Sequence, residues 1–298
     1  MSKHNPNGVQ LDRSFTDRLI SVITYVVYAI FAFVCIYPFY YIFINSISAN
    51  NLSERGKVIF YPMEVHFQNY ANVAKIPGLM NAARISVLRT VIGTALTVIV
   101  AGFLGYMFTR QTLWKRRFWY RFVVVTMYFN AGIIPWYLTM DKLGMTNNFW
   151  GYIFPTIIQP FYIILCKTFC ESVPKELQDA GEIDGAGTLR IFFSIMLPNV
   201  KNAIITVFLF SFVWNWGEYY LSKQFLGSDN RSIMTALSML RMDLSQVSAL
   251  AGVQLGTNPE KIVTRMQAGC LLTVAPMLIM FVFTQRFLAD SIEHIGIK

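Results

Sequence analysis

Six stretches of this chain are each long enough and apolar enough to cross a lipid bilayer as a helix. A membrane-spanning helix needs about 20 predominantly apolar residues, and the stretches that qualify cover residues 19–44, 85–108, 118–140, 149–169, 203–220 and 268–288. They are too long and too continuously apolar to be the alternating segments of about ten residues that build a transmembrane β-barrel. Charged residues make up only 14% of the chain, against roughly 25% in soluble domains. The sequence therefore predicts an all-α integral membrane protein with six transmembrane helices.

Basic residues near the ends of the spans predict how the chain is oriented. The connector over residues 109–121 contains five basic residues and no acidic one, and the N-terminal tail adds three more. Because short cytoplasmic loops carry an excess of Lys and Arg, we expect both termini and residues 170–202 in the cytoplasm. We expect a cytoplasmic tail over 1–18, a transmembrane domain over 19–290 and a C-terminal tail over 291–298. The same bias explains the net charge of +9 and gives no reason to expect nucleic-acid binding.

The chain contains none of the common catalytic or nucleotide-binding motifs. It lacks the GxxxxGK[ST] pattern of a P-loop, the zinc motif HExxH and the GxSxG of a nucleophile elbow. Cys166 and Cys170 share a helix face, but no further candidate ligand lies near them in the sequence, and buried cysteine commonly acts as a small apolar residue. We therefore expect no catalytic residue, metal or cofactor on this chain, and an energy source that another protein supplies.

The segment between the fourth and fifth spans, residues 171–200, predicts a helix–turn–helix on the cytoplasmic side. Pro174 suits the first position of a helix, and Glu176 and Asp179 lie in its first turns, where carboxylates oppose the positive end of the helix dipole. Small residues then permit close approach of a partner, an apolar stripe follows, and Pro198 is expected to end the second helix. Two interpretations stay open on these grounds: a helix that docks to a partner protein, and a connector that lies on the membrane.

This segment resembles the EAA loop of bacterial ABC importer permeases. The family pattern is Glu-Ala-Ala, three residues, Gly, nine residues, and then Ile-x-Leu-Pro. Here Asp179-Ala180-Gly181 stands at the Glu-Ala-Ala, Gly185 at the Gly and Ile195-Met196-Leu197-Pro198 at the end, with the spacing intact. The two departures keep the charge and the small size, although Gly in place of Ala costs about 1 kcal/mol of helix propensity. Ile183-Asp184-Gly185-Ala186 also matches the extended sugar-permease version of the motif.

Further matches over nearly the whole chain resemble the carbohydrate-uptake permeases of the maltose-transporter type. Phe60-Tyr61-Pro62, with Phe67-Gln68-Asn69-Tyr70 after it, is similar to their first external loop. Their Trp-Asn signature and C-terminal tail are matched by Trp214-Asn215, Gln285-Arg286-Phe287 and Gly296-Ile297-Lys298. The run from Asn130 to Tyr137 and Lys142-Leu143-Gly144-Met145 resembles the LplC and YtcP subgroup. Members of that subgroup are linked to complex or acidic oligosaccharides, alginate fragments among them.

The resemblance implies the permease subunit of an ATP-driven importer that moves a sugar or oligosaccharide into the cytoplasm by alternating access. In this family a second permease subunit, usually a different chain, completes the pathway. Two ATPase subunits hold ATP and Mg, and a solute-binding protein delivers the sugar from outside. The chain itself is then not an enzyme, and it lies in the bacterial cytoplasmic (inner) membrane. The residues implied to couple it to the ATPase are Glu176, Asp179, Ala180, Gly181, Asp184, Gly185, Ala186, Ile195, Leu197 and Pro198.

Residues suited to a solute path can also be proposed, because sugars are bound by aromatic stacking and a few convergent polar groups. They are Tyr128, Asn130, Gln159, Trp214, Asn215, Glu218 and Arg89. For the aromatic ones an interfacial belt is the alternative, and for Arg89 it is snorkelling toward the outer interface. A same-family permease for another solute, a secondary transporter and a membrane-embedded enzyme remain alternative functions. A secondary transporter calls for ionisable groups for ion coupling inside the spans, where Arg89 and Glu218 are the candidates, and an embedded enzyme calls for clustered His, Asp or Ser nucleophile pairs, which the sequence does not show.

Overall fold

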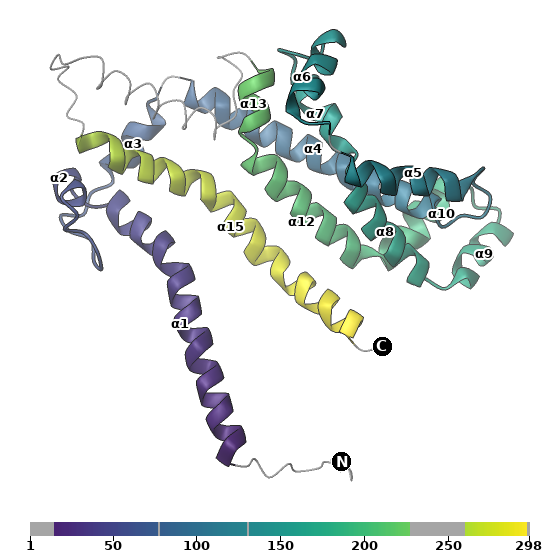
Figure 1. The fold of residues 1–298 in the computed structure, drawn as a ribbon, viewed down its shortest axis with the longest axis horizontal. Helices are drawn as coiled ribbons and strands as arrows, with labels where there is room; N and C mark the ends of the chain where they lie inside the picture. The colour runs from purple at the N-terminus through teal and green to yellow at the C-terminus, as the bar shows by residue number, and fades with distance from the viewer. Residues whose placement is uncertain (1–14, 77, 130, 227–259, 297–298) are drawn as a thin grey trace.

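The computed structural model describes residues 15–76, 78–129, 131–226 and 260–296, and every regular element in these ranges is a helix (Figure 1). The three longest helices are α1 (Phe15–Ser46), α4 (Leu79–Met107) and α15 (Glu260–Gly296). The shorter ones are α2 (Asn50–Glu54), α3 (Gln68–Ala74), α5 (Arg116–Tyr128), α6 (Ile133–Lys142), α7 (Phe149–Ile157), α8 (Pro160–Ser172), α9 (Lys175–Ile183), α10 (Thr188–Ile191), α11 (Leu197–Asn199), α12 (Lys201–Gly217) and α13 (Tyr220–Phe225), with a π-helix, Phe192–Met196, between α10 and α11. The all-α prediction is confirmed for the described residues.

Three helices are long and apolar enough to cross a membrane alone. They are α1, α4 and the part of α15 over Gln267–Arg286. Three bent pairs pass the same test when each is counted as one span: α5 with α6, α7 with α8, and α10–α11 with α12. The described helices thus provide three spans, or up to six if every bent pair crosses once.

The bent pairs differ from the straight spans that the apolar runs predicted. In place of one helix over 118–140, α5 and α6 meet at 119°, and Gly132 at the start of α6 has a φ of +81°. The expected span over 149–169 is bent by 45° between α7 and α8. Here Pro160 opens α8 and Gln159 before it is extended, with ψ 109°, because proline excludes the helical conformation from the preceding residue.

Helix α4 is the centre of the packed body, with α8 and α12 against it. Glycines let these helices approach closely. A Cβ on Gly105 would lie 2.7 Å from the Cβ of Cys166 and 2.8 Å from the backbone nitrogen of Lys167. Helix α15 runs beside α12 (Figure 1), and the indole nitrogen of Trp216 donates to the carbonyl of Thr273 at 2.6 Å. Trp216 is therefore a buried packing residue between α12 and α15.

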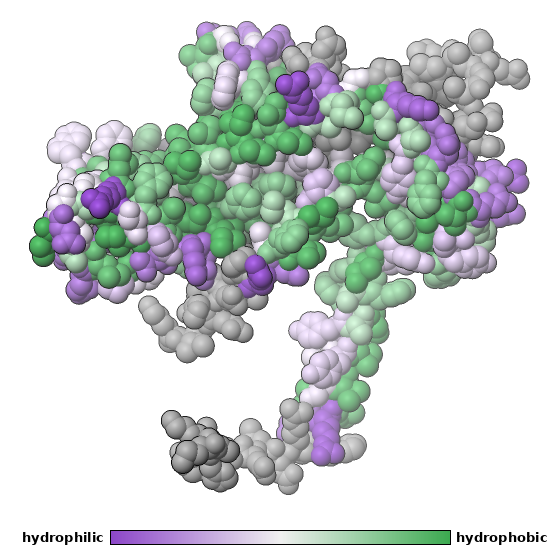
Figure 2. All heavy atoms as spheres, turned by 180° about the vertical axis from the view of Figure 1, so that it is seen from behind, coloured by the Kyte–Doolittle hydropathy of each residue, from purple (hydrophilic) through white to green (hydrophobic). Residues whose placement is uncertain are grey.

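Helix α1 stands apart from this body. It projects away from the other helices (Figure 1), and Figure 2 shows apolar side chains along its length and across the middle of the body. None of its most apolar 18-residue window is buried within the chain. A helix that is apolar all round is suited to a membrane, so this surface matches lipid or another membrane-embedded helix.

Candidate functional site

Helix α9 ends in a backbone turn that requires glycine at position 185. The N–H of Gly185 donates to the carbonyl of Glu182 at 3.0 Å, and the N–H of Ala186 donates to the carbonyl of Gly181 at 2.9 Å. This pair of bonds is the Schellman motif, whose first residue past the cap is left-handed, and Gly185 has a φ of +74°. Any L side chain in that conformation costs roughly 1–2 kcal/mol. Backbone geometry therefore explains why glycine occupies this place in the segment.

Gly181 packs inside the segment itself. A Cβ added there would lie 2.8 Å from Cδ1 of Ile195 and 3.3 Å from Cγ1 of Ile191. The small residue thus lets α9 fold onto the helix that follows it. The expectation that position 181 leaves room for a partner is wrong, because the chain's own isoleucines fill the space.

The second half of the segment is joined to α4 by an aromatic core. The ring of Phe192 stacks on that of Tyr106 with centroids 5.8 Å apart, and both side chains are fully buried with Met196. Pro198 lacks the N–H that would bond to the carbonyl four residues earlier, and the wider π-helical turn directly precedes α11. The helix ends at Asn199, one residue after the predicted end, and the chain then turns by 87° into α12.

The outer face of α9 combines acidic and apolar side chains. Ile183 is 86% exposed and Leu177 42%. Six of the predicted coupling residues are exposed and three are half-buried; the first group is Glu176, Asp179, Ala180, Asp184, Gly185 and Pro198, and the second is Ala186, Ile195 and Leu197. On another side of α9, Glu182 forms an ion pair with Arg110, just beyond α4. One face of α9 is thus attached to the body and another is left open.

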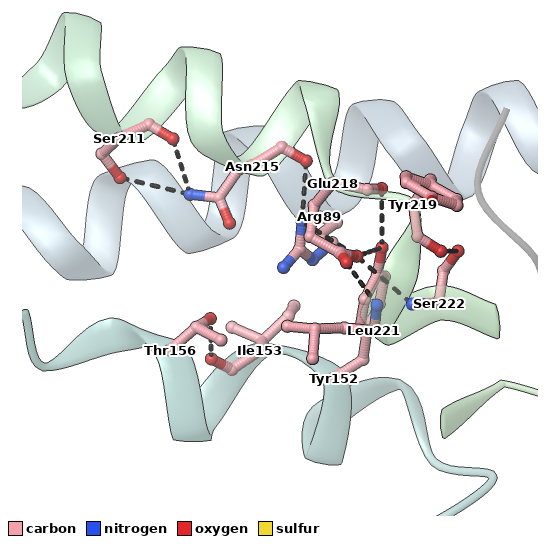
Figure 3. Close-up of polar contacts among 10 residues, drawn as sticks. All are labelled: Arg89, Tyr152, Ile153, Thr156, Ser211, Asn215, Glu218, Tyr219, Leu221 and Ser222. Carbon is pink, nitrogen blue, oxygen red and sulfur yellow. Dashed lines mark hydrogen bonds and ion pairs between the residues drawn. The ribbon is translucent and has the colours of Figure 1, made fainter. Parts of the chain in front are cut away.

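A second group of polar side chains is buried where α4, α7 and α12 meet (Figure 3). Arg89 of α4 is 0% exposed. Its Nη1 donates to the carbonyl of Asn215 at 2.7 Å and lies 3.9 Å from the carboxylate of Glu218. The guanidinium sits over the ring of Tyr152 of α7, 4.0 Å from the centroid. The charge is therefore compensated inside the chain. The alternative interpretation, in which Arg89 snorkels toward the outer interface, is wrong.

Glu218 connects this polar cluster to α13. Its carboxylate accepts from the hydroxyl of Tyr152 at 2.7 Å and from the backbone N–H of Ser222 at 3.2 Å, and it also accepts from the N–H of Leu221. Asn215 donates to the carbonyl of Ser211 at 2.9 Å. Among the described residues, Nε and Nη2 of Arg89 have no hydrogen-bond partner. The polar cluster thus contains one buried cation with two donor nitrogens that have no hydrogen-bond partner in the described part of the chain.

The structure brings together three of the proposed path residues: Arg89, Asn215 and Glu218. Tyr128 and Trp214 are exposed on α5 and α12, and Gln159 is half-buried at the break between α7 and α8. Asn130 lies outside the described residues. Tyr152 was missed, because nothing in the sequence separates it from the other 14 of the chain's 15 tyrosines. No cluster of three or more potential metal ligands occurs within the described ranges.

Comparison with known proteins adds a family and several relatives. Residues 93–293 match the family described as "Binding-protein-dependent transport system inner membrane component". The polygalacturonan/rhamnogalacturonan transport system permease protein YtcP of Bacillus subtilis (strain 168) is 28% identical over 283 residues, which cover 92% of this chain and 96% of that protein. Protein LplC of the same strain is 27% identical over 261 residues, covering 87% of this chain and 88% of LplC.

A solved structure is also similar over almost the whole chain. It is described as the crystal structure of a bacterial ABC transporter involved in the import of the acidic polysaccharide alginate. One of its chains superimposes with a TM-score of 0.83 at 27% identity, and the match covers 92% of this chain and 98% of that chain.

Proposed function

Because the chain belongs to the family of binding-protein-dependent transport system inner membrane components, we propose that it is the permease subunit of an ATP-driven importer for a sugar or oligosaccharide. The resemblance to sugar ABC permeases and to the LplC and YtcP subgroup is confirmed. The observation that carries the proposal is the match to a subunit of the alginate importer over 92% of the chain. In this family the permease subunit is not itself an enzyme.

The proposed topology has six spans with both termini in the cytoplasm of a bacterial cell. The pairs α5–α6 and α7–α8 each count as one crossing, and α12 alone is the fifth span, with α10–α11 along the cytoplasmic face. The ion pair between Arg110 and Glu182 supports this arrangement. It joins the start of the basic connector 109–121 to α9, so the segment 171–200 lies at the same end of the body as the charges that the positive-inside rule assigns to the cytoplasm.

Helix α9 is proposed to dock to an ATPase subunit through its open face, where Leu177 and Ile183 are exposed beside acidic residues. Motion of α9 would reach α4 by two contacts, the ion pair from Glu182 and the stacked ring of Phe192. Movement of α9 transmitted in this way would switch the transmembrane helices between inward-open and outward-open arrangements when the ATPase dimer closes. Two ATPase subunits with ATP and Mg, a second permease chain and a solute-binding protein complete the assembly.

The proposed solutes are acidic oligosaccharides. Polygalacturonan, rhamnogalacturonan and alginate are named for two of the similar proteins, and all three contain uronic acids. Tyr128, Gln159 and Trp214 are proposed to line the path together with Asn130, because sugars bind to aromatic faces and convergent amides. Asn215 and Glu218, also proposed for the path, contact Arg89 in the buried polar cluster.

Uptake in cells tests this function and separates it from secondary transport. A strain that lacks the chain should lose uptake of oligogalacturonate, and the chain should restore it. Uptake should stop when ATP is depleted and continue when an ionophore collapses the ion gradients. Uptake that follows the ion gradient and not ATP would contradict the proposal.

A further inference from the structure

The segment between α2 and α3 turns back along the C-terminal part of α1 (Figure 1). The hydroxyl of Tyr37 donates to the carbonyl of Ile59 at 3.2 Å, and that of Tyr40 donates to the carbonyl of Phe60 at 2.6 Å. The rings of Tyr37 and Phe60 are 6.3 Å apart. Ile59, Phe60 and Tyr61, which we call the aromatic tip, therefore lie beside α1 and do not extend beyond its end.

Polar contacts fix both limbs of this turn, one to the end of α1 and the other to residues 48–49 just after it. On the limb that follows α2, the side-chain amide of Asn45 donates to the carbonyl of Val58 at 3.2 Å, and Val58 is fully buried. On the limb that leads to α3, the N–H of Met63 donates to the hydroxyl of Ser48 at 3.1 Å. The carbonyl of Met63 accepts from the N–H of Ala49 at 3.0 Å. The position of the aromatic tip along α1 is thus set by the fold.

The level of the aromatic tip in the membrane follows from the length of α1. Arg18 is the last charged residue before the apolar run, and a hydrocarbon layer of about 30 Å takes about 20 helical residues. Counted from Leu19, such a span ends near Pro38. Tyr37 and Tyr40 then stand at the boundary of the hydrocarbon layer, and the tip that they hold stands at the same level. Ser46 at the end of α1 lies about 9 Å further out than Tyr40.

The chemistry of the aromatic tip suits that level. Its side chains are 45%, 66% and 62% exposed for Ile59, Phe60 and Tyr61. No charge occurs from residue 58 to residue 63, and Lys57 and Glu64 border this stretch. Amphipathic aromatic residues are enriched where acyl chains meet lipid headgroups. In water the same exposed apolar area would be unfavourable, at roughly 25 cal/mol per Å².

We propose that the aromatic tip inserts into the lipid leaflet at the C-terminal end of α1 and fixes the depth of this helix. The tip binds at the boundary between the lipid headgroups and the acyl chains. The tip continues the exposed apolar surface of α1, where Phe39 and Phe43 are also exposed. Because α1 is held to the body of the protein mainly near this end, an anchor here limits how far it slides or tilts. The proposal requires only that α1 crosses the membrane.

Spin labels on the full chain in phospholipid nanodiscs test the insertion. Cys35 and Cys270, which are exposed, are replaced by alanine, and single labels are placed through Phe60→Cys, Ile36→Cys and Arg55→Cys. Ile36 faces outward on α1, and Arg55 is exposed just past α2. Collisions with oxygen, which prefers lipid, and with a water-soluble nickel chelate are measured for each label. The label at 60 should favour oxygen over nickel severalfold, like that at 36, and the label at 55 should favour nickel.

Two results would overturn the insertion. A label at 60 that behaves like the one at 55 places the tip in water, and a label shielded from both reagents places it under protein and not in lipid. The label at 36 reports separately whether α1 is in the bilayer. A second variant tests the anchor: Tyr37→Phe with Tyr40→Phe should make the label at 60 more mobile and reduce its preference for oxygen. Unchanged spectra would refute the role of these hydroxyls.

Discussion

Serine at position 185 tests the link between one backbone angle and energy coupling. Gly185 has a φ of +74°, and no atom lies within 4 Å of the place where its Cβ would stand. The effect of Gly185→Ser is therefore confined to the backbone. A left-handed L residue costs roughly 1–2 kcal/mol, which changes an opening equilibrium by a factor of about 5–30.

The matched control is Gly187→Ser, two residues later. Gly187 also has open space at its Cβ position, but its φ of −68° and ψ of 162° suit any residue. It is the N-cap of α10, where serine is a favoured residue. We expect this second serine to leave the segment as stable as in the wild type or slightly more stable.

Hydrogen exchange of the peptide over 175–186, followed by mass spectrometry on the reconstituted complex, measures the difference. Amides of the turn, those of Gly185 and Ala186 among them, should exchange about 5–30 times faster in Gly185→Ser and at the wild-type rate in Gly187→Ser. Uptake per ATP hydrolysed should fall in the first variant alone. Equal exchange in the two variants would refute the assignment of strain to position 185.

Three further predictions concern single side chains. Gly181→Ala should keep uptake, because only the movable end of Ile195 lies within 3 Å of the new Cβ, whereas Gly181→Leu should lower it; equal uptake would contradict the packing described here. Arg89→Gln should destabilise the protein by about 3–5 kcal/mol in denaturant unfolding, with uptake of acidic oligosaccharides falling as well. Adding Glu218→Gln should recover part of that loss, and simple additivity would show that the two charges do not interact. Gln159→Ala should raise the KM for uptake, and unchanged kinetics with every oligosaccharide tested would remove Gln159 from the path.

Features that depend on local composition could be predicted from the sequence. Long apolar runs predicted the candidate membrane helices, since about 20 such residues are needed for any crossing. The helix–turn–helix expected over residues 171–200 is present, because α9 begins one residue after Pro174 and the second helix ends one residue after Pro198. The bend at Gln159 was missed although Pro160 signals it, because the apolar run continues through the break.

Contacts between distant residues could not be predicted in this way. Tyr152 and Glu218 are 66 positions apart, and Arg89 and Asn215 are 126 apart. An intramembrane charge indicates that a partner exists but not which residue provides it. Gly181 shows the same limit, because a small residue predicts close packing and leaves open whether the neighbour belongs to the same chain.

The measurement that tests the central claim most directly is the ATPase activity of the purified importer in proteoliposomes. The complex contains this chain, its partner permease, the ATPase subunits and the solute-binding protein. We predict that ATP hydrolysis rises severalfold when the binding protein carries an acidic oligosaccharide such as oligogalacturonate, and rises little with a neutral one of equal length. The Gly185→Ser complex should lose this stimulation, and the Gly187→Ser complex should keep it. Hydrolysis that is indifferent to loaded binding protein would contradict the assignment of this chain as the permease that links solute to ATP.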